Sequence, residues 1–353
     1  MSLSRTCSGI LLTLLFVCVI SSALNIQPAR AEGMIYIRAD GSIDPPTAPI
    51  SSIDNVTYTF TDNISGSIGI KRSGIVIDGE GYTLQGPGPE LNIGIDFSER
   101  VNVTVQHTQI EGFSYGISGI PAGYGGVSNY TISRNNLTNN YYGISLALTA
   151  GNRILENNII GNYVGISLSY ETVSYPPDYD PIYYDIILGN NIVNNQYGIQ
   201  LYQTGYGVIY HNNFIGNYQQ VYNLESTIVW YSNYPFGGNY WSDYVDVDSH
   251  SGEYQNKTGG DGIWDHPYVM DANNQDNYPL VSPFWYWNDP ILGDVNKDMR
   301  VDGKDVVFVA RHWSPNVGNS NYDSLYDLND PKDGKIDGKD LALLAKYFNT
   351  HYL

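Results

Sequence analysis

Apolar and polar residues between positions 127 and 222 follow one short pattern that occurs four times. In each copy a pair of asparagines precedes an apolar residue, and in the first three copies a glycine lies six residues beyond it. Together with one earlier residue in the same relation to a glycine, the apolar positions are Ile110, Leu137, Ile159, Ile192 and Phe214. Their separations are 27, 22, 33 and 22 residues, which is a 22-residue period with insertions of five and eleven residues.

This period predicts a stack of similar coils. A fixed repeat of about this length is typical of units that bury their apolar faces only against their neighbours. Each unit contains three short runs of β-branched or aromatic residues separated by Asn and Gly turns, without helical periodicity. The sequence therefore predicts an all-β solenoid, a parallel β-helix. A β-sandwich with coincidental strand spacing is the alternative.

Two polar features of the repeat have expected structural roles. Stacking the coils aligns one asparagine from each pair, and we expect a buried ladder of amides along the axis at Asn136, Asn158, Asn191 and Asn213. The glycines Gly143, Gly165 and Gly198 suit a turn with positive φ. Glycosylation sequons occur at Asn55, Asn63, Asn102, Asn129, Asn136 and Asn256. We expect Asn136 to stay unmodified because it belongs to the predicted ladder.

The regular coils lie between segments of different character. Residues 1–31 resemble a secretion signal, with Arg5, an apolar run and a small-residue cleavage pattern. We expect an N-terminal cap and first coils in 32–110 and regular coils in 111–228. An aromatic, Gly- and Asp-rich C-terminal cap is expected in 229–287, followed by a linker in 288–293 and a last domain in 294–353.

Charge and cysteine content limit the partners and the compartment. The chain has 17 Lys and Arg against 36 Asp and Glu, so nucleic acid and anionic membranes are poor partners. Both cysteines, Cys7 and Cys18, lie in the signal-like segment, so a processed chain would contain no thiol. The apolar run of that segment is too short for a spanning helix, and no later segment is predicted to cross a bilayer.

The C-terminal region contains a predicted Ca²⁺ loop. Short acidic and amide side chains at positions 1, 3, 5, 9 and 12 converge only if the loop curls around a cation, and all of these ligands are oxygens. The predicted ligands are Asp294, Asn296, Asp298, the Arg300 carbonyl, Asp302 and Asp305. Met299 replaces the usual glycine, and Asp305 replaces the usual glutamate.

A second copy of this loop follows. It keeps Gly334 but carries two extra residues before Asp333. Its predicted ligands are Asp327, Asn329, Asp333, the Lys335 carbonyl, Asp337 and Asp340. An acidic linker with two helices is the alternative to a Ca²⁺-binding domain.

Two further groups of side chains have more than one interpretation. The acids of the predicted C-terminal cap can gather around a hard cation or form solvated turns: Asp243, Asp246, Asp248, Asp261 and Asp265. Prolines exclude an interior strand from the eleven-residue insertion within 169–184, so this insertion must leave the coil. Its tyrosines can stack on sugar rings or pack over the flank of the helix.

Residues 291–348 resemble a type I dockerin domain, on the paired loops and on the matching runs Val301-Asp-Gly-Lys-Asp and Ile336-Asp-Gly-Lys-Asp. This resemblance implies that Ca²⁺ folds the domain, and that residues 294–348 bind a cohesin-like module on another protein. Positions 10 and 11 of the loops are Gly303-Lys304 and Gly338-Lys339, unlike the hydroxyl pair of the cellulosomal type.

Residues 33–287 resemble NosD-like, right-handed parallel β-helix proteins of archaeal cell surfaces. The resemblance lies in the repeats and in the runs Ile35-Tyr-Ile-Arg-Ala-Asp-Gly, Ile77-Asp-Gly-Glu-Gly-Tyr-Thr-Leu and Asn239-Tyr-Trp-Ser-Asp-Tyr. It implies a class that includes carbohydrate-binding proteins and sugar hydrolases, and the family name implies copper.

These patterns favour a secreted or cell-surface, non-catalytic module that associates with carbohydrate and is attached through a Ca²⁺-dependent domain. A glycoside hydrolase or polysaccharide lyase is the first alternative, and Asp78 and Asp96 are the weak candidates for its carboxylates. Copper handling is the second alternative. Its support is poor because the histidines and methionines form no visible cluster of soft ligands.

Overall fold

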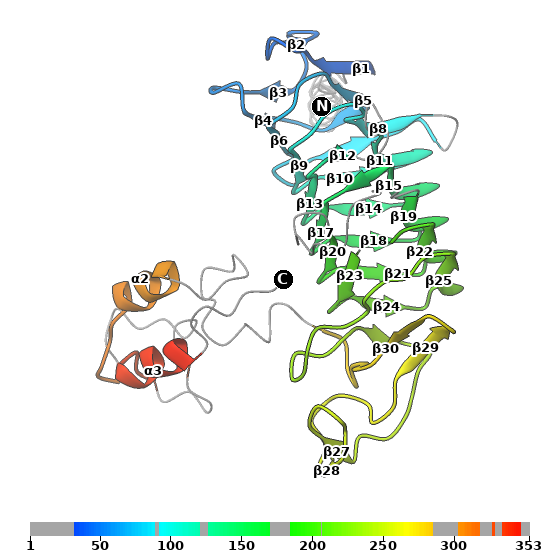
Figure 1. Cartoon of the computed structure of the whole chain (residues 1–353). Helices are drawn as coiled ribbons and strands as arrows, with labels where there is room; N and C mark the ends of the chain where they lie inside the picture. Colours follow the sequence, from blue (N-terminus) through cyan, green and yellow to red (C-terminus); the bar gives the residue numbers. More distant parts are fainter. Residues whose placement is uncertain are drawn as a thin grey trace, which may run out of the picture.

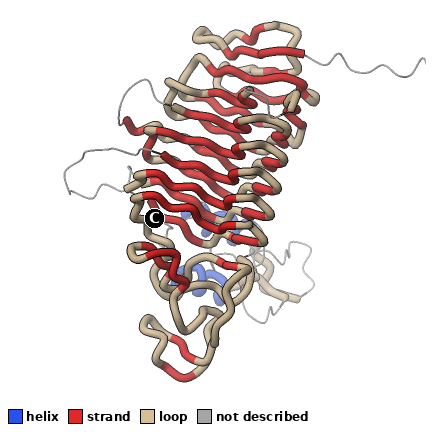
Figure 2. The backbone as a smooth tube through the Cα atoms, turned by 90° about the vertical axis from the view of Figure 1, so that its right-hand side faces the viewer, coloured by secondary structure: helices blue, strands red, loops and turns tan. Residues whose placement is uncertain are grey.

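The described chain consists mainly of short parallel strands that stack in successive coils (Figure 1). In this computed structural model the described residues are 32–88, 92–120, 126–169, 184–205, 207–284, 303–317, 327–328 and 334–346. Each regular coil contributes one strand to each of three faces and pairs with the equivalent strands of the coils before and after it (Figure 2). The prediction of a parallel β-helix is confirmed.

The three faces are defined by their strands. Face 1 contains β4 (Thr57–Phe60), β6 (Ile75–Asp78), β9 (Val103–Gln106), β13 (Thr131–Ser133), β17 (Arg153–Leu155), β20 (Asp185–Leu188) and β23 (Gly207–Tyr210). Face 2 contains β7 (Thr83–Gln85), β10 (Gln109–Glu111), β14 (Asn136–Thr138), β18 (Asn158–Ile160), β21 (Asn191–Val193), β24 (Asn213–Ile215) and β26 (Tyr240–Trp241). Face 3 contains β8 (Ile93–Asp96), β11 (Tyr115–Gly119), β15 (Tyr142–Ala147), β19 (Val164–Ser169), β22 (Tyr197–Tyr202) and β25 (Gln219–Leu224).

The remaining elements lie outside this regular pattern. Strand β5 (Ile64–Ile70) pairs with both β7 and β8, and so joins face 2 to face 3. The other elements are β1 (Glu32–Ile37), β2 (Ile43–Asp44), β3 (Ile50–Ser51), β12 (Gly126–Val127), β16 (Thr149–Ala150), β27 (His250–Ser251), β28 (Lys257–Thr258), β29 (Tyr268–Asp271), β30 (Asn274–Asp276), α2 (Gly303–Arg311) and α3 (Gly338–Lys346). Among the described residues, neither the length nor the apolar content of any helix suffices to cross a membrane.

The predicted apolar column is confirmed in full. The backbones of its members are direct partners on face 2, in the order Ile110, Leu137, Ile159, Ile192 and Phe214. Every one of these side chains is fully buried. The two insertions fall where the sequence placed them, one between β11 and β13 and the other between β19 and β20. Each coil therefore buries its apolar side chains against the coils on either side.

Two corners of the coil have constant lengths. From β9 to β24, corner 1 connects face 1 to face 2 with two residues in each of five coils, and corner 2 connects face 2 to face 3 with three residues. The first residue of corner 1 has a positive φ even where it carries a side chain, as at Arg134 (56°) and Glu156 (55°). A left-handed residue here turns the chain sharply from one face to the next.

The predicted asparagines Asn136, Asn158, Asn191 and Asn213 are in register on face 2. The amide of Asn213 donates to Asn191, and that of Asn191 donates to Asn158 (both 2.8 Å). The fully buried ladder, however, lies one residue earlier than predicted. Asn136 is partly exposed and Asn158 is exposed, because each directly precedes an inward apolar residue in a strand and therefore points outward. The buried ladder is instead formed by the second residue of corner 1, at Asn135, Asn157, Asn190 and Asn212. The expectation that Asn136 stays unmodified thus loses its structural basis.

Each asparagine of the buried ladder connects three coils. The backbone N–H of Asn157 donates to Oδ1 of Asn190 in the next coil (2.9 Å), and its side-chain amide donates to the same atom (2.9 Å). The same amide also donates to the Ile132 carbonyl of the preceding coil (2.8 Å). Oδ1 of Asn157 in turn accepts from the backbone N–H of Asn135 (2.9 Å). These bonds satisfy polar backbone groups that the sharp corner leaves without a strand partner.

A second buried ladder runs along corner 2, which the repeat analysis did not identify. Its members are the middle residues of this corner, Asn140, Asn162, Asn195 and Asn217. Asn162 repeats the geometry of Asn157, because its backbone N–H donates to Oδ1 of Asn195 (2.8 Å) and its amide donates to the Leu137 carbonyl (3.0 Å). The two ladders together hold both constant corners in register.

The glycines of face 3 serve close packing and not a positive φ. Gly143, Gly165 and Gly198 are absent from the positive-φ glycines of the described chain. A Cβ at Gly143 would lie 2.6 Å from the carbonyl oxygen of Gly165, and one at Gly165 would lie 2.5 Å from that of Gly198. The predicted reason was therefore wrong: only hydrogen fits between the stacked backbones at this position.

The first asparagine ladder ends on a buried carboxylate. Asn212 donates to Oδ1 of Asn239 (3.1 Å), and the backbone N–H of Asn239 donates to Oδ2 of Asp276 (2.7 Å). Oδ2 also accepts from the indole of Trp241 (2.9 Å), and Oδ1 accepts from the backbone N–H of Tyr278 (3.0 Å). Burial raises the pKa of Asp276 to about 7, although these hydrogen bonds oppose the rise.

This carboxyl group predicts a pH-dependent stability. Its pKa is higher in the folded chain than in an unfolded one, so the folded state binds the extra proton between about pH 4 and pH 7. The contribution of Asp276 to stability is then greatest at low pH within this window and is lost as pH rises to 7. We expect Asp276 to contribute a loss of about 2 to 3 kcal/mol of unfolding free energy between pH 5 and pH 8, while buried His211, whose pKa is lowered, contributes an opposing gain. Relative to the natural chain, Asp276→Asn should therefore gain about 2 to 3 kcal/mol between these pH values in urea denaturation, and an identical pH dependence in both chains would contradict this assignment.

Candidate functional site

The second predicted Ca²⁺ loop is partly described and leads directly into α3. Asp337 precedes the helix and accepts a hydrogen bond from the backbone N–H of Lys339 (2.8 Å), as an N-cap residue does. Asp340, three residues later, accepts one from the backbone N–H of Asp337 (2.7 Å). This reciprocal arrangement is a capping box, and it fixes both carboxylates at the positive end of the helix.

The two ends of this loop lie close together. Asp340 Oδ1 accepts a hydrogen bond from the backbone N–H of Leu328 (2.8 Å), the residue that directly follows Asp327. Asp327 Oδ2 accepts one from the backbone N–H of Gly334 (2.9 Å). Asp327 is 1% exposed and Asp340 is fully buried. Two buried carboxylates in one loop repel each other, and an oxygen-preferring divalent cation between them relieves this repulsion.

A small core and one β-bridge support the loop. Ser314, just after α2, forms an antiparallel bridge with Ile336, and the two backbone hydrogen bonds are both 3.0 Å long. The buried apolar side chains beside it are Val309, Leu328, Ile336 and Leu344. Asp305, the predicted last ligand of the first loop, is fully buried in α2, as Asp340 is in α3. The two helix starts are thus equivalent, as the matching sequence runs suggest.

Several predicted ligands lie outside the described residues: Asp294, Asn296, Asp298, Arg300, Asp302, Asn329 and Asp333. The described positions are Asp305, Asp327, Lys335, Asp337 and Asp340. In the described part of the chain, no three His, Cys, Asp or Glu side chains form a group that could hold a metal ion. The described donors are all oxygens near the two ends of the loop, so they fit Ca²⁺ as part of a larger set.

Asp78, a weak catalytic candidate, lines an open depression of about 570 Å³ beside Glu80, His107 and Arg134. Its carboxylate accepts hydrogen bonds from the Gln106 side chain (2.6 Å) and the Glu80 backbone N–H (3.0 Å), and it lies 3.2 Å from His107 Nδ1. Burial acts to raise the pKa of Asp78, but these contacts outweigh it and hold the pKa below its usual value. Such a carboxylate stays ionised and is a poor general acid.

Asp96, the other candidate, does not share this depression. Asp78 ends β6 on face 1, where its backbone partner is Gln106, whereas Asp96 ends β8 on face 3, opposite Ser118. Asp96 accepts a hydrogen bond from the backbone N–H of Ser98 (2.9 Å), which is a turn-capping contact. The fold therefore places the two carboxylates on different faces, where they cannot flank the same glycosidic bond.

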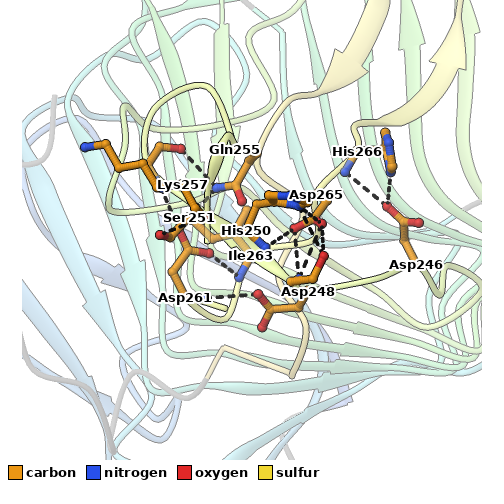
Figure 3. A network of polar contacts seen from close by, with 12 residues as sticks. Asp246, Asp248, His250, Ser251, Gln255, Lys257, Asp261, Ile263, Asp265 and His266 are labelled. Carbon is orange, nitrogen blue, oxygen red and sulfur yellow. Dashed lines mark hydrogen bonds and ion pairs between the residues drawn. The ribbon is translucent and has the colours of Figure 1, made fainter. Parts of the chain in front are cut away.

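Most acids of the C-terminal region belong to one network of polar contacts, and the pair of Asp246 and His266 lies to one side of it (Figure 3). Asp248 accepts from the backbone N–H groups of Asp261 (3.0 Å) and Gly262 (3.1 Å). Asp265 binds Ser249 and His250, and Asp246 binds His266, with a carboxylate–imidazole distance of 2.7 Å in both pairs. Burial acts to raise the pKa of Asp265, but the hydrogen bonds from His250 and Ser249 hold it well below its usual value. Of the two interpretations, the described geometry supports turns and not a shared cation.

The histidines of the β-helix region are distributed in the same way. His107, His250 and His266 each contact a different aspartate. His211 is buried and stacks on Phe284 with ring centroids 4.0 Å apart, and burial lowers its pKa to about 4. The histidines that the structure describes are therefore not gathered as ligands, and they do not fit a copper centre.

Face 3 and corner 2 carry a row of tyrosines that the repeat analysis did not single out. Their rings contact one another from coil to coil, at Tyr115, Tyr141, Tyr142, Tyr163, Tyr197, Tyr202 and Tyr222. The sequence signal was present, because a tyrosine directly precedes the glycine in two copies of the repeat, at Tyr142 and Tyr197. The tyrosines predicted to leave the coil within 169–184 lie outside the described residues, apart from Tyr184.

Comparison with known families agrees with this architecture. The sequence profile of the family described as "Periplasmic copper-binding protein (NosD)" matches residues 50–245, more than half of the chain. The profile of the dockerin type I domain matches residues 292–349. Neither a curated protein nor a solved structure matches the chain. From the stacked coils and these two matches, the chain belongs to the NosD family of parallel β-helix proteins and carries a dockerin type I domain after the β-helix.

Proposed function

We propose that this protein is an exported, non-catalytic β-helix module that associates with carbohydrate and is attached to a cohesin-like partner through its dockerin domain. The observation that carries this proposal is that Asp327 and Asp340, at the two ends of the second predicted loop, are both buried and that Asp340 accepts a hydrogen bond from the backbone N–H of Leu328. Export is supported by the signal-like pattern of residues 1–31, which lie outside the described residues.

Calcium is proposed as the resident ion of both loops. The second site would be held by Asp327, Asn329, Asp333, the Lys335 carbonyl, Asp337 and Asp340. The first would be held by Asp294, Asn296, Asp298, the Arg300 carbonyl, Asp302 and Asp305. When bound, Ca²⁺ would supply the positive charge that lets these acids fold together, and it would take no part in a reaction.

The non-catalytic assignment is supported by the acids of the β-helix. Asp78 is held as an ionised, hydrogen-bonded carboxylate, and Asp96 lies on a different face. Glu156, another acid of the regular coils, lies in corner 1 and pairs with Arg134 of the preceding coil at 2.7 Å. These carboxylates stabilise turns and corners, so a pair suited to glycosidic bond cleavage is not formed by them.

Binding to a panel of immobilised type I cohesin modules tests the proposal. We expect the full chain to bind at least one module in Ca²⁺ by surface plasmon resonance and to dissociate in EGTA. Asp340→Asn, which keeps a hydrogen-bond acceptor but removes a ligand charge, should weaken binding by about tenfold or more at limiting Ca²⁺. Asp330→Asn is the matched control, because Asp330 is not a predicted ligand. Binding that persists unchanged in EGTA would contradict a Ca²⁺-dependent attachment.

A further inference from the structure

The row of tyrosines on face 3 and corner 2 forms a continuous aromatic surface along the helix axis. Tyr141 and Tyr163, at the end of corner 2 in successive coils, stack with centroids 4.6 Å apart, and each is 43% exposed. Tyr115 and Tyr142, at the start of β11 and β15, stack at 5.0 Å with nearly parallel rings. Tyr218, in the same position of corner 2 two coils beyond Tyr163, is 81% exposed.

The chemistry of this surface differs from that of the whole chain. The strands β11, β15, β19, β22 and β25 contain no Asp, Glu, Lys, Arg or His, although the chain has 36 acidic and 17 basic residues. The accessible polar side chains beside the tyrosines are hydroxyls and amides, such as Ser145, Gln196 and Gln219. Such a surface offers rings, hydroxyls and amides without charge.

The surface is also periodic. Tyr142, Val164 and Tyr197 are direct backbone partners on face 3, so equivalent positions repeat once per coil, at a strand spacing of about 4.8 Å. Tyrosine does not occupy every one of these positions, because Val164 lies between Tyr142 and Tyr197. A series of equivalent backbone positions with rings on several coils still suits a polymer with a repeating unit. Exposed aromatic surfaces of this kind commonly mark interaction sites.

We propose that this tyrosine surface binds a neutral polysaccharide, with the glycan chain lying along the helix axis. Apolar C–H groups of the sugar would contact the exposed edges of the stacked Tyr141 and Tyr163 rings and the more exposed ring of Tyr218, while neighbouring amides and hydroxyls exchange hydrogen bonds with the sugar hydroxyls. The absence of charge from these strands matches an uncharged ligand and offers no cation to an acidic one. This proposal rests on the carbohydrate association proposed above and specifies its site and ligand class.

Affinity electrophoresis of the full chain tests the site. The gels contain hydroxyethylcellulose, mannan, galactan or dextran as neutral probes and polygalacturonate as the acidic probe. We expect retardation by at least one neutral polysaccharide. The double variant Tyr141→Ala/Tyr163→Ala should weaken that binding by about tenfold, which corresponds to about 1.4 kcal/mol. The control Tyr254→Ala should bind like the natural chain, because Tyr254 is 77% exposed but lies outside face 3 and corner 2.

Further measurements separate a lost site from a lost fold. Tyr218→Ala removes the most exposed ring and should also weaken binding, whereas Tyr141→Phe/Tyr163→Phe keeps both rings and should retain most of it. The proposal is overturned if no neutral probe retards the chain, if only polygalacturonate does, or if folded alanine variants bind normally. Retardation should persist in EGTA, which abolishes cohesin binding, so failure of the glycan site is distinguishable from failure of the dockerin attachment.

Discussion

Replacing Asn157 with alanine is expected to lower the unfolding free energy of the β-helix by about 3 kcal/mol. The Oδ1 of Asn157 accepts a hydrogen bond from the buried backbone N–H of Asn135. Its side-chain amide donates to the Ile132 carbonyl and to Oδ1 of Asn190. Alanine leaves the Asn135 N–H without this acceptor inside the fold, where water cannot replace it. Urea denaturation monitored by far-UV circular dichroism measures the loss.

The adjacent residue provides the control. Asn158 is exposed, and its side chain accepts one hydrogen bond, from the amide of Asn191 (2.8 Å). Asn158→Ala should therefore change the unfolding free energy by less than about 0.5 kcal/mol. The two variants remove the same atoms one position apart, so equal destabilisation would show that the buried ladder does not hold the coils in register.

Removal of Ca²⁺ with EGTA is expected to abolish the unfolding transition of the dockerin domain and to leave the transition of the β-helix in place. Among the described residues, the apolar core of the domain has four buried side chains with three partly buried ones packed against them, which is small for independent stability: Val309, Leu328, Ile336 and Leu344, with Val306, Leu341 and Leu343. At a thousandfold excess over its dissociation constant, each bound Ca²⁺ contributes about 4 kcal/mol of stability. Differential scanning calorimetry with and without EGTA separates the two transitions.

A substitution assigns this effect to the second loop. Asp340→Asn should raise the Ca²⁺ concentration that restores the dockerin transition, and Asp330→Asn should not. If chelation instead shifted the β-helix transition by a similar amount, cation binding outside the two loops would have to account for it. The carboxylates of Asp246, Asp248 and Asp265 already accept hydrogen bonds from backbone amides, Ser249 and histidines, which argues against such a site in the C-terminal region.

The sequence was sufficient for the architecture because the repeat has a strict apolar period. Leu137 and Ile159 lie at the same place in equivalent coils, and the strand pairing follows from that single fact. The ladder was displaced by one residue because an Asn-Asn pair does not itself show which amide turns inward. Strand alternation back from Leu137 would have placed Asn136 outside, so the error came from the interpretation and not from missing information.

Other features depend on contacts between residues that the sequence does not relate. Position 143 requires glycine because a side chain there would collide with the carbonyl oxygen of Gly165 in the next coil. This close approach exists only in the stacked structure. The end of the first ladder at Asp276 brings together segments 37 residues apart. In the C-terminal region the density of acids suggested a cation, but their partners are backbone amides and histidines. A high local acid content does not show where each side chain points.

The constant lengths of corners 1 and 2 determine where this chain can accept insertions. Adding a residue to either corner would move an asparagine such as Asn157 or Asn162 away from the coils above and below it. Both insertions of the repeat accordingly lie after a face 3 strand, between β11 and β13 and between β19 and β20. Insertions, whether natural or engineered, are therefore expected at the edge between face 3 and face 1. The two edges formed by corners 1 and 2 keep a constant length.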